Sequence, residues 1–205
     1  GNGTMEQFNP KNEKISYGGA SFSRDGEGIY YSSDEGTEFR HLRYYDIKKD
    51  KHTILTETIP WDVSTFTQSD DGKLLAFTTN ENAITKLRVV KTFGFREIKI
   101  PKLPYGNISG LKFDPSGSKI ALNINSSKTP GDVYVLNLIS GKLIQWTKSE
   151  VGGLNTESFV DTELVEIYSF DGLKISGFLY KPHSPGPHPV VVYIHGGPES
   201  QFRPG

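Results

Sequence analysis

The sequence predicts a mainly β protein: a partial β-propeller of about three four-stranded blades, followed by the first strands of an α/β domain. Three observations support this fold class. A strand, tight turn, strand pattern recurs along the first part of the chain, and no amphipathic helix of useful length precedes about Thr162. A continuous apolar, β-branched run then lies near the C-terminal end. We expect residues 1–153 to form the partial propeller and residues 154–205 to begin the second domain.

The repeat is marked by three tight turns that end in glycine. Gly26, Gly72 and Gly117 lie 46 residues (26 to 72) and 45 residues (72 to 117) apart. This spacing matches the roughly 40–50 residues that one propeller blade occupies. Glycine suits such a turn because it accepts a positive φ, and the preceding Asp or Ser side chain can bond back to the turn backbone.

Each repeat contains a second pair of β-rich segments, which completes a four-stranded blade. The pair is clearest at residues 132–138 and 143–146, and the first copy has residues 42–47 followed by a turn at 48–51. The middle copy is predicted to use residues 87–90 and 96–100. Because a lone blade cannot bury both faces of its sheet, neighbouring blades must stack, and about three blades make an incomplete propeller.

Aromatic residues at strand positions are expected to form the core between blades. They are Tyr30, Tyr31, Tyr44, Tyr45, Phe77, Phe113, Tyr134 and Trp146. Trp61 and Phe66 lie in a less regular stretch and are the better candidates for a surface contact.

Composition excludes several classes of function. The net charge is −1, with basic and acidic residues interspersed, so we expect no nucleic-acid partner and no membrane partner. The sequence has no cysteine, which excludes disulfides and agrees with a reducing compartment; with no signal peptide in the printed sequence, we expect a cytoplasmic location. His183 and His188 lack a third ligand, and the turn aspartates lack the spacing of a calcium loop, so no metal and no cofactor are predicted.

A second domain is predicted after a glycine-bearing linker at residues 150–154. Residues 165–170 and 175–180 form a hairpin around the Asp171-Gly172 turn, and a proline-rich connector follows. Residues 189–194 are apolar throughout, which suits a strand buried on both faces of a central sheet.

The chemistry-bearing residues follow this run directly, as His195-Gly196-Gly197-Pro198. A strand that ends in two glycines leaves backbone N–H groups open to the close approach of an oxyanion. With the upstream repeat and the Asp171-Gly172 hairpin before Lys181-Pro182, this motif resembles the prolyl oligopeptidase family of serine peptidases, particularly its acylaminoacyl-peptidase and dipeptidyl-peptidase-like branches. The resemblance covers nearly the whole chain.

The resemblance implies a propeller that caps an α/β-hydrolase domain, of which residues 154–205 would be the truncated N-terminal part. It implies a hydrolase that uses a Ser, Asp, His triad and no cofactor to cleave small peptide substrates or remove their N-terminal residues. It assigns Gly197, and secondarily Gly196, to the oxyanion hole, and His195 and Pro198 to positioning of the loop. His195 stands where some relatives have a tyrosine. Glu199, Gln201 and Arg203 are expected to line the rim or to stabilise the loop.

No Gly-x-Ser-x-Gly motif occurs in the sequence, so no catalytic residue is predicted in this chain. The family order places the triad downstream of Gly205, and the chain alone is expected to be inert. Two alternatives stay open: a non-catalytic propeller scaffold similar to WD-repeat or TolB-like proteins, and an esterase with the same hydrolase core. The sequence indicates no oligomeric state.

Overall fold

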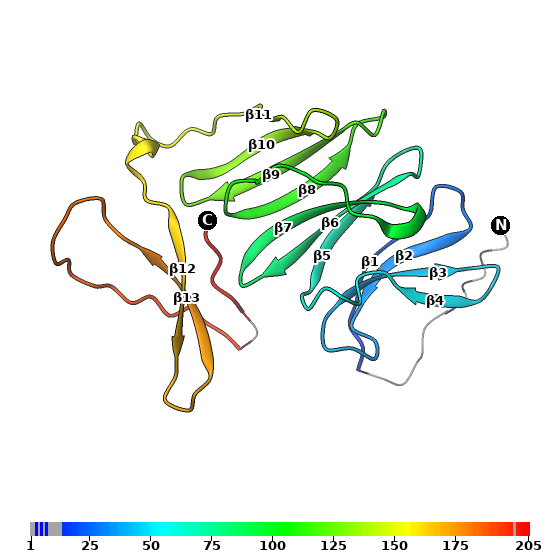
Figure 1. Ribbon diagram of the computed structural model, residues 1–205, viewed down its shortest axis with the longest axis horizontal. Coiled ribbons are helices and arrows are strands. Elements are labelled where there is room, and N and C mark those ends of the chain that lie inside the picture. Colours follow the sequence, from blue (N-terminus) through cyan, green and yellow to red (C-terminus); the bar gives the residue numbers. More distant parts are fainter. Residues whose placement is uncertain (1–2, 4, 6, 8–13, 199) are drawn as a thin grey trace.

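The structure is a computed structural model that describes residues 3, 5, 7, 14–198 and 200–205. The described residues form three antiparallel sheets, here named blades 1 to 3, and a separate two-stranded hairpin (Figure 1). Blade 1 contains β1 (Tyr17–Phe22), β2 (Gly28–Ser33), β3 (His41–Asp46) and β4 (Lys51–Ile54). Blade 2 contains β5 (Val63–Gln68), β6 (Leu74–Glu81) and β7 (Ile84–Lys91). Blade 3 contains β8 (Asn107–Phe113), β9 (Lys119–Ser126), β10 (Thr129–Asn137) and β11 (Leu143–Gln145), and the hairpin contains β12 (Thr162–Tyr168) and β13 (Lys174–Tyr180).

Helix is confined to two 3-10 turns in the described part of the chain, η1 (Phe93–Phe95) and η2 (Thr156–Ser158). None of the helices among the described residues has the length and apolarity of a membrane-spanning segment. The predicted mainly β fold with partial propeller is therefore confirmed, and the three blades lie side by side as in a propeller (Figure 1).

The predicted turn glycines have the backbone conformation that the repeat requires. Gly26, Gly72 and Gly117 have φ values of 73°, 71° and 69°. In each turn the glycine N–H donates to the carbonyl three residues earlier, at 2.8, 3.0 and 2.9 Å respectively. The same turn joins β12 to β13, where Gly172 donates to the Ser169 carbonyl at 3.0 Å. A residue with a side chain would be strained at these positive φ values.

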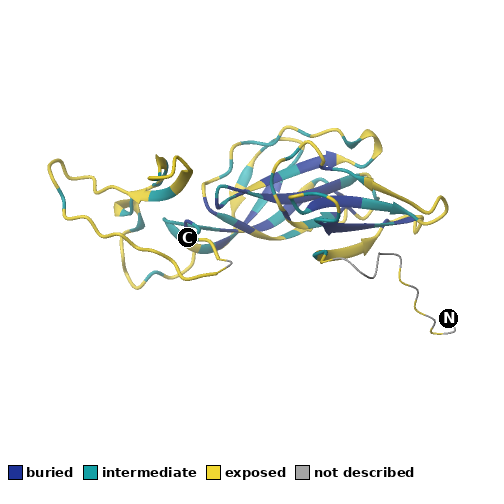
Figure 2. Ribbon diagram, turned by 90° about the horizontal axis from the view of Figure 1, so that it is seen from below, coloured by how far each residue is buried: buried dark blue, intermediate teal, exposed yellow. Residues whose placement is uncertain are grey.

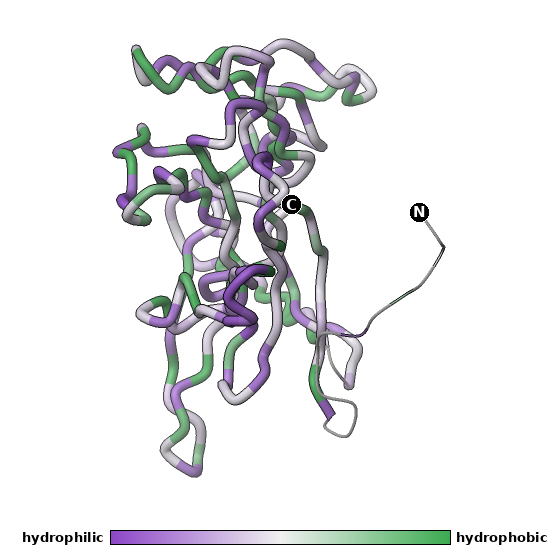
Figure 3. The backbone as a smooth tube through the Cα atoms, turned by 90° about the vertical axis from the view of Figure 1, so that its right-hand side faces the viewer, coloured by the Kyte–Doolittle hydropathy of each residue, from purple (hydrophilic) through white to green (hydrophobic). Residues whose placement is uncertain are grey.

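Alternation along β6 creates the two cores between the blades. Leu75 and Phe77 pack with Tyr30 and Leu42 of blade 1, whereas Ala76 packs with residues of blade 3. Successive side chains of a strand point to opposite faces, so the middle blade supplies one face to each neighbour. Buried residues accordingly gather in the blades, and hydrophobic and hydrophilic stretches alternate along the chain (Figures 2 and 3).

The middle blade corrects one prediction, because residues 96–100 do not form a fourth strand. The segment begins to pair with β7. The Lys91 N–H donates to the Arg96 carbonyl at 2.8 Å, and the Ile98 N–H donates to the Val89 carbonyl at 2.7 Å. Pro101 and Pro104 follow, and proline has no N–H to extend the ladder. Blade 2 therefore has three regular strands and a short, irregular edge segment.

The apolar run at residues 189–194 corrects a second prediction. It is not a regular strand, and the residues from Val190 to Ile194 are 75–91% exposed (Figure 2). A strand buried on both faces needs neighbouring strands and covering helices. No such neighbours occur among the described residues, so the run has nothing to pair with.

The predicted aromatic core is confirmed for most of its members and wrong for one. Tyr30, Tyr31, Phe77, Phe113 and Tyr134 are buried, whereas Trp146 is 71% exposed because it follows the last, outermost strand of blade 3. Phe66 packs against the core between blades 1 and 2, so it is not a free surface contact. Trp61 is half buried.

Candidate functional site

The predicted oxyanion loop lies at the end of the exposed apolar run. Residues 195–198 are all exposed, and the Nδ1 of His195 donates a hydrogen bond to the Gly196 carbonyl at 2.6 Å. This contact fixes the imidazole to its own loop, which is the geometry expected of a side chain that positions the loop. The roles assigned to His195 and Pro198 stay predictions.

Gly196 and Gly197 are not required by packing within the described chain. A Cβ added to either residue meets no atom within 4 Å, and neither residue has a φ in the left-handed region. The space on the side-chain side of both residues is therefore open. Two unobstructed glycines leave room for a substrate oxygen to approach the backbone, which is the steric requirement of an oxyanion hole.

A groove flanks the run that leads to this loop. It lies between β13 and residues 188–195, and its volume is about 820 Å³. This falls within the roughly 300–1,000 Å³ typical of small-ligand sites. Phe202 lies 6.0 Å from Phe178 and 5.9 Å from Tyr193, measured between ring centroids. This aromatic contact connects the apolar run to the hairpin.

The last described residues connect the loop to the blades. The Asn80 side-chain amide at the end of β6 donates to Gln201 Oε1 at 2.9 Å, and Pro204 is buried. Gly205 lies against Asn125 and Asn107 of blade 3 (Figure 1). Gln201 thus connects the segment after the loop to β6, and its predicted role, at the rim or in stabilising the loop, stays a prediction. Arg203 is half buried, and Glu199 lies outside the described residues.

No catalytic dyad forms in the described part of the chain around three of its histidines. His41 contacts Thr56 Oγ1 at 3.2 Å, His188 contacts the Ser184 carbonyl at 2.9 Å, and His195 contacts the Gly196 carbonyl. Activation of a serine needs a base bonded to its hydroxyl, and the bonds that these three rings form go to a threonine hydroxyl and two backbone carbonyls instead. The described residues also hold no group of three or more His, Cys, Asp or Glu side chains that would bind a metal ion.

Sequence reasoning missed a carboxylate that joins blade 3 to the linker. Asp132 is 4% exposed, and its Oδ1 accepts bonds from Thr147 Oγ1 and the Ser149 N–H, both at 2.8 Å. Burial alone would raise the pKa of Asp132, but bonds from Thr147, Thr129 and Ser149 hold it below its ordinary value. The only sequence signal is an Asp just before the apolar residues 133–136, with Thr147 and Ser149 fifteen and seventeen positions later.

The fold and the loop together define a class: propeller blades joined through a linker to a hairpin and an open Gly-Gly loop. No family model matches the sequence, and no curated protein matches it. Solved structures do. A prolyl endopeptidase, described in a study of inter-domain dynamics in catalysis and specificity, matches with a TM-score of 0.63 and 22% identity over 82% of this chain and 24% of its own.

Two further structures support the same fold. Prolyl oligopeptidase B from Galerina marginata matches with a TM-score of 0.71 and 13% identity, over 86% of this chain and 25% of its own. Puromycin hydrolase matches with a TM-score of 0.68 and 15% identity, over 84% of this chain and 26% of its own. The chain thus spans about a quarter of the length of these structures and shares the fold of their propeller region.

Proposed function

We propose that this chain is the junction between the propeller and the catalytic domain of a serine peptidase. The peptidase hydrolyses short peptides or removes N-terminal residues through an acyl-enzyme, as in the acylaminoacyl-peptidase and dipeptidyl-peptidase-like branches of the prolyl oligopeptidase family. The observation that carries the proposal is the open loop at Gly196 and Gly197, placed after an apolar run on a fold shared with prolyl oligopeptidases. A scaffold protein has no physical need for two unobstructed glycines there.

In this proposal the Gly197 N–H, with Gly196 as the second contributor, stabilises the negative charge that develops on the substrate carbonyl oxygen. His195 and Pro198 shape the loop. The blades restrict entry to small peptides, and the reaction uses no cofactor. The absence of cysteine from the sequence supports a reducing compartment such as the cytoplasm.

The 205-residue chain alone is inactive in this proposal, because it holds no Gly-x-Ser-x-Gly elbow. The triad is supplied by sequence downstream of Gly205. The exposed run from Val190 to Ile194 then becomes a buried strand of the completed α/β sheet, which would cover the apolar surface that the described residues leave open.

A fluorophosphonate probe tests the proposal, since it labels only activated serines. The 205-residue chain is compared with a version extended through its natural reading frame, and the labelled residue is located by mass spectrometry. We expect labelling of the extended chain alone, at a serine in a Gly-x-Ser-x-Gly turn. If neither folded chain is labelled, the scaffold function replaces the peptidase; turnover of esters but not peptides would instead favour the esterase.

The role of Gly197 is tested in the same extended chain. Gly197→Val places a branched side chain beside the proposed oxyanion donor, and we expect the acylation rate to fall at least about tenfold. Gly177→Ala in β13 is the matched control, because an added Cβ there meets only Val165, at 4.0 Å. Equal rates for the two variants would remove Gly197 from the oxyanion hole.

A further inference from the structure

A cavity lies between blades 1 and 2, away from the loop described above. Its volume is about 580 Å³, and residues of the β1–β2 turn, the β5–β6 turn and the segment after β7 line it. These turns are at the opposite ends of the strands from Asn80, the residue that contacts Gln201. The cavity falls within the roughly 300–1,000 Å³ typical of small-ligand sites.

The lining of the cavity includes a tyrosine hydroxyl that bonds no described residue. Tyr30 is 9% exposed, and its Oη has no hydrogen-bond partner among the described residues. The oxygen is also absent from the polar atoms that are sealed off from solvent, so it reaches solvent through the cavity. Burial, with smaller effects of Tyr44 and Asp25, raises the pKa of Tyr30 to about 12. The hydroxyl is therefore neutral and free to bond a ligand.

Aromatic rings form the walls. The ring of Tyr44 lies 4.9 Å from that of Tyr30, and Phe93, at the mouth, is 91% exposed. Phe95 completes the wall with a φ of 47°. Bulky residues rarely adopt a positive φ, and such strain is often kept where a binding site needs it. The ring faces of Tyr and Phe attract cations.

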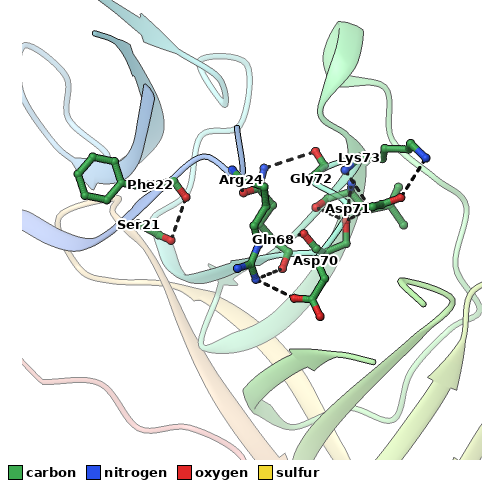
Figure 4. A network of polar contacts seen from close by, with 10 residues as sticks. Ser21, Phe22, Arg24, Gln68, Asp70, Asp71, Gly72 and Lys73 are labelled. Carbon is green, nitrogen blue, oxygen red and sulfur yellow. Dashed lines mark hydrogen bonds and ion pairs between the residues drawn. The ribbon is translucent and has the colours of Figure 1, made fainter. Parts of the chain in front are cut away.

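The charges on the lining are mostly negative. Asp25, Asp70 and Asp71 line the cavity together with one cation, Arg24. Asp71 pairs with Lys73 at 3.2 Å and Asp70 pairs with Arg24, so Asp25 is the lining carboxylate that forms no ion pair among the described residues. The guanidinium of Arg24 is already bonded to residues of the β5–β6 turn (Figure 4). Its Nη2 lies 3.0 Å from Asp70 Oδ1, and its Nε donates to the Ser69 carbonyl at 3.2 Å. Bonds from the Ser23 hydroxyl and the Glu27 N–H hold the pKa of Asp25 below its ordinary value, so Asp25 is ionised at neutral pH.

We propose that the cavity between blades 1 and 2 is a second binding site, for a small molecule that carries an amidinium or ammonium group on an aromatic body. The cation lies near Asp25 and the aromatic walls, and the Tyr30 hydroxyl accepts one of its N–H bonds. The site is independent of the proposed peptidase activity, because both blades that form it are described here and the oxyanion loop contributes nothing to it.

Benzamidine and benzamide are the probes, because they share size and shape and differ in charge. Each is titrated into the 205-residue chain, and amide chemical shifts are followed by NMR. We expect saturable shifts with benzamidine at Gly28, Tyr30 and Phe93, and binding of benzamide that is at least about tenfold weaker. No shift with up to about 10 mM benzamidine, or equal binding of benzamide, would overturn the proposal.

Variants distinguish the cavity from a general acidic surface. We expect Asp25→Asn to weaken benzamidine binding about tenfold and Tyr30→Phe about threefold. Asp171→Asn is the matched control: Asp25 and Asp171 occupy the same position in Ser-x-Asp-Gly turns, and each Oδ1 accepts the N–H two residues later, at 3.0 and 3.1 Å. An unchanged affinity for both cavity variants, or an equal loss in Asp171→Asn, would contradict the proposed site. Near-UV circular dichroism of each variant verifies its fold.

Discussion

Gly28 in β2 allows one aromatic ring to lie flat on blade 1. A Cβ at this position would overlap the Cζ, Oη and Cε2 atoms of Tyr44 on the neighbouring strand. The φ of Gly28 is not in the left-handed region, so the need for glycine is steric. The absent side chain lets Tyr44 approach Tyr30, and the pair forms part of the core between blades 1 and 2.

We therefore expect Gly28→Ala to lower the free energy of unfolding by about 1–3 kcal/mol, because the ring of Tyr44 must shift to admit the added Cβ. Gly19→Ala in β1 is the control, because its added Cβ meets only Phe66, at 4.0 Å. Urea unfolding followed by tyrosine fluorescence measures both variants. An equal cost for the two would show that strand glycines, rather than the Tyr44 contact, determine the effect.

Two contacts between blades 1 and 2 illustrate how burial determines the contribution of an interaction to stability. Gln68 at the end of β5 is 8% exposed, and its Oε1 accepts the Arg24 N–H at 3.0 Å (Figure 4). The neighbouring Arg24–Asp70 ion pair has side chains that are 50% and 60% exposed. An exposed ion pair is screened by water, whereas the loss of a buried acceptor leaves its donor without a hydrogen-bond partner.

For these two contacts we expect Gln68→Leu to cost about 1–2 kcal/mol in the free energy of unfolding, and Asp70→Asn to change it by less than about 0.5 kcal/mol. Thermal unfolding of the two variants at 0.15 M salt provides the comparison. The reverse order would mean that the ion pair, and not the buried amide, holds blades 1 and 2 together.

Asp132 connects two elements, the last blade and the linker that follows β11. Its ionised form accepts bonds from Thr147 and Ser149, and its pKa lies below the ordinary value although burial acts in the other direction. A carboxyl with a lowered folded pKa stabilises the fold above its unfolded pKa of about 3.9, and this stabilisation is lost as the pH falls through the folded value.

Asp132→Asn should therefore lower the free energy of unfolding by about 1–3 kcal/mol at pH 7, and the difference from the parent chain should shrink below about pH 4. Urea unfolding between pH 3 and pH 7 measures the difference. A gap that stays constant over this range would show that the charge of Asp132 contributes nothing. Asp161→Asn, which removes an exposed partner of Lys128, is the control and should leave the free energy almost unchanged.

At the scale of the whole molecule, the sequence predicted the features that depend on residues close together in the chain. Gly26, Gly72 and Gly117 indicated the blades because a turn residue with a positive φ is usually glycine, which is visible in the sequence. The Asp132 network escaped prediction because its members meet only after β10 and β11 pair. The burial of residues 189–194 was predicted wrongly because a run of β-branched residues indicates what could be buried, whereas burial also needs partners elsewhere in the chain.

The exposed apolar run at residues 190–194 is expected to make the whole chain self-associate. Residues 190–194 are exposed, β-branched or aromatic, uncharged and free of proline, which is the composition of self-associating segments. We expect the 205-residue chain to self-associate at micromolar concentration, and Val191→Lys to suppress this by placing a charge in the middle of the run. Light scattering coupled to size-exclusion chromatography measures the mass of each chain.

The matched control is Ile139→Lys, because Ile139 is 85% exposed in the turn after β10, outside the exposed run at residues 190–194. Ile139→Lys should leave the mass distribution of the chain unchanged. Should both lysine variants suppress association equally, net charge would be the cause, and the exposed run would not be the surface through which the chain self-associates. Suppression by Val191→Lys alone would locate the self-associating surface of the molecule at the apolar run that precedes the Gly-Gly loop.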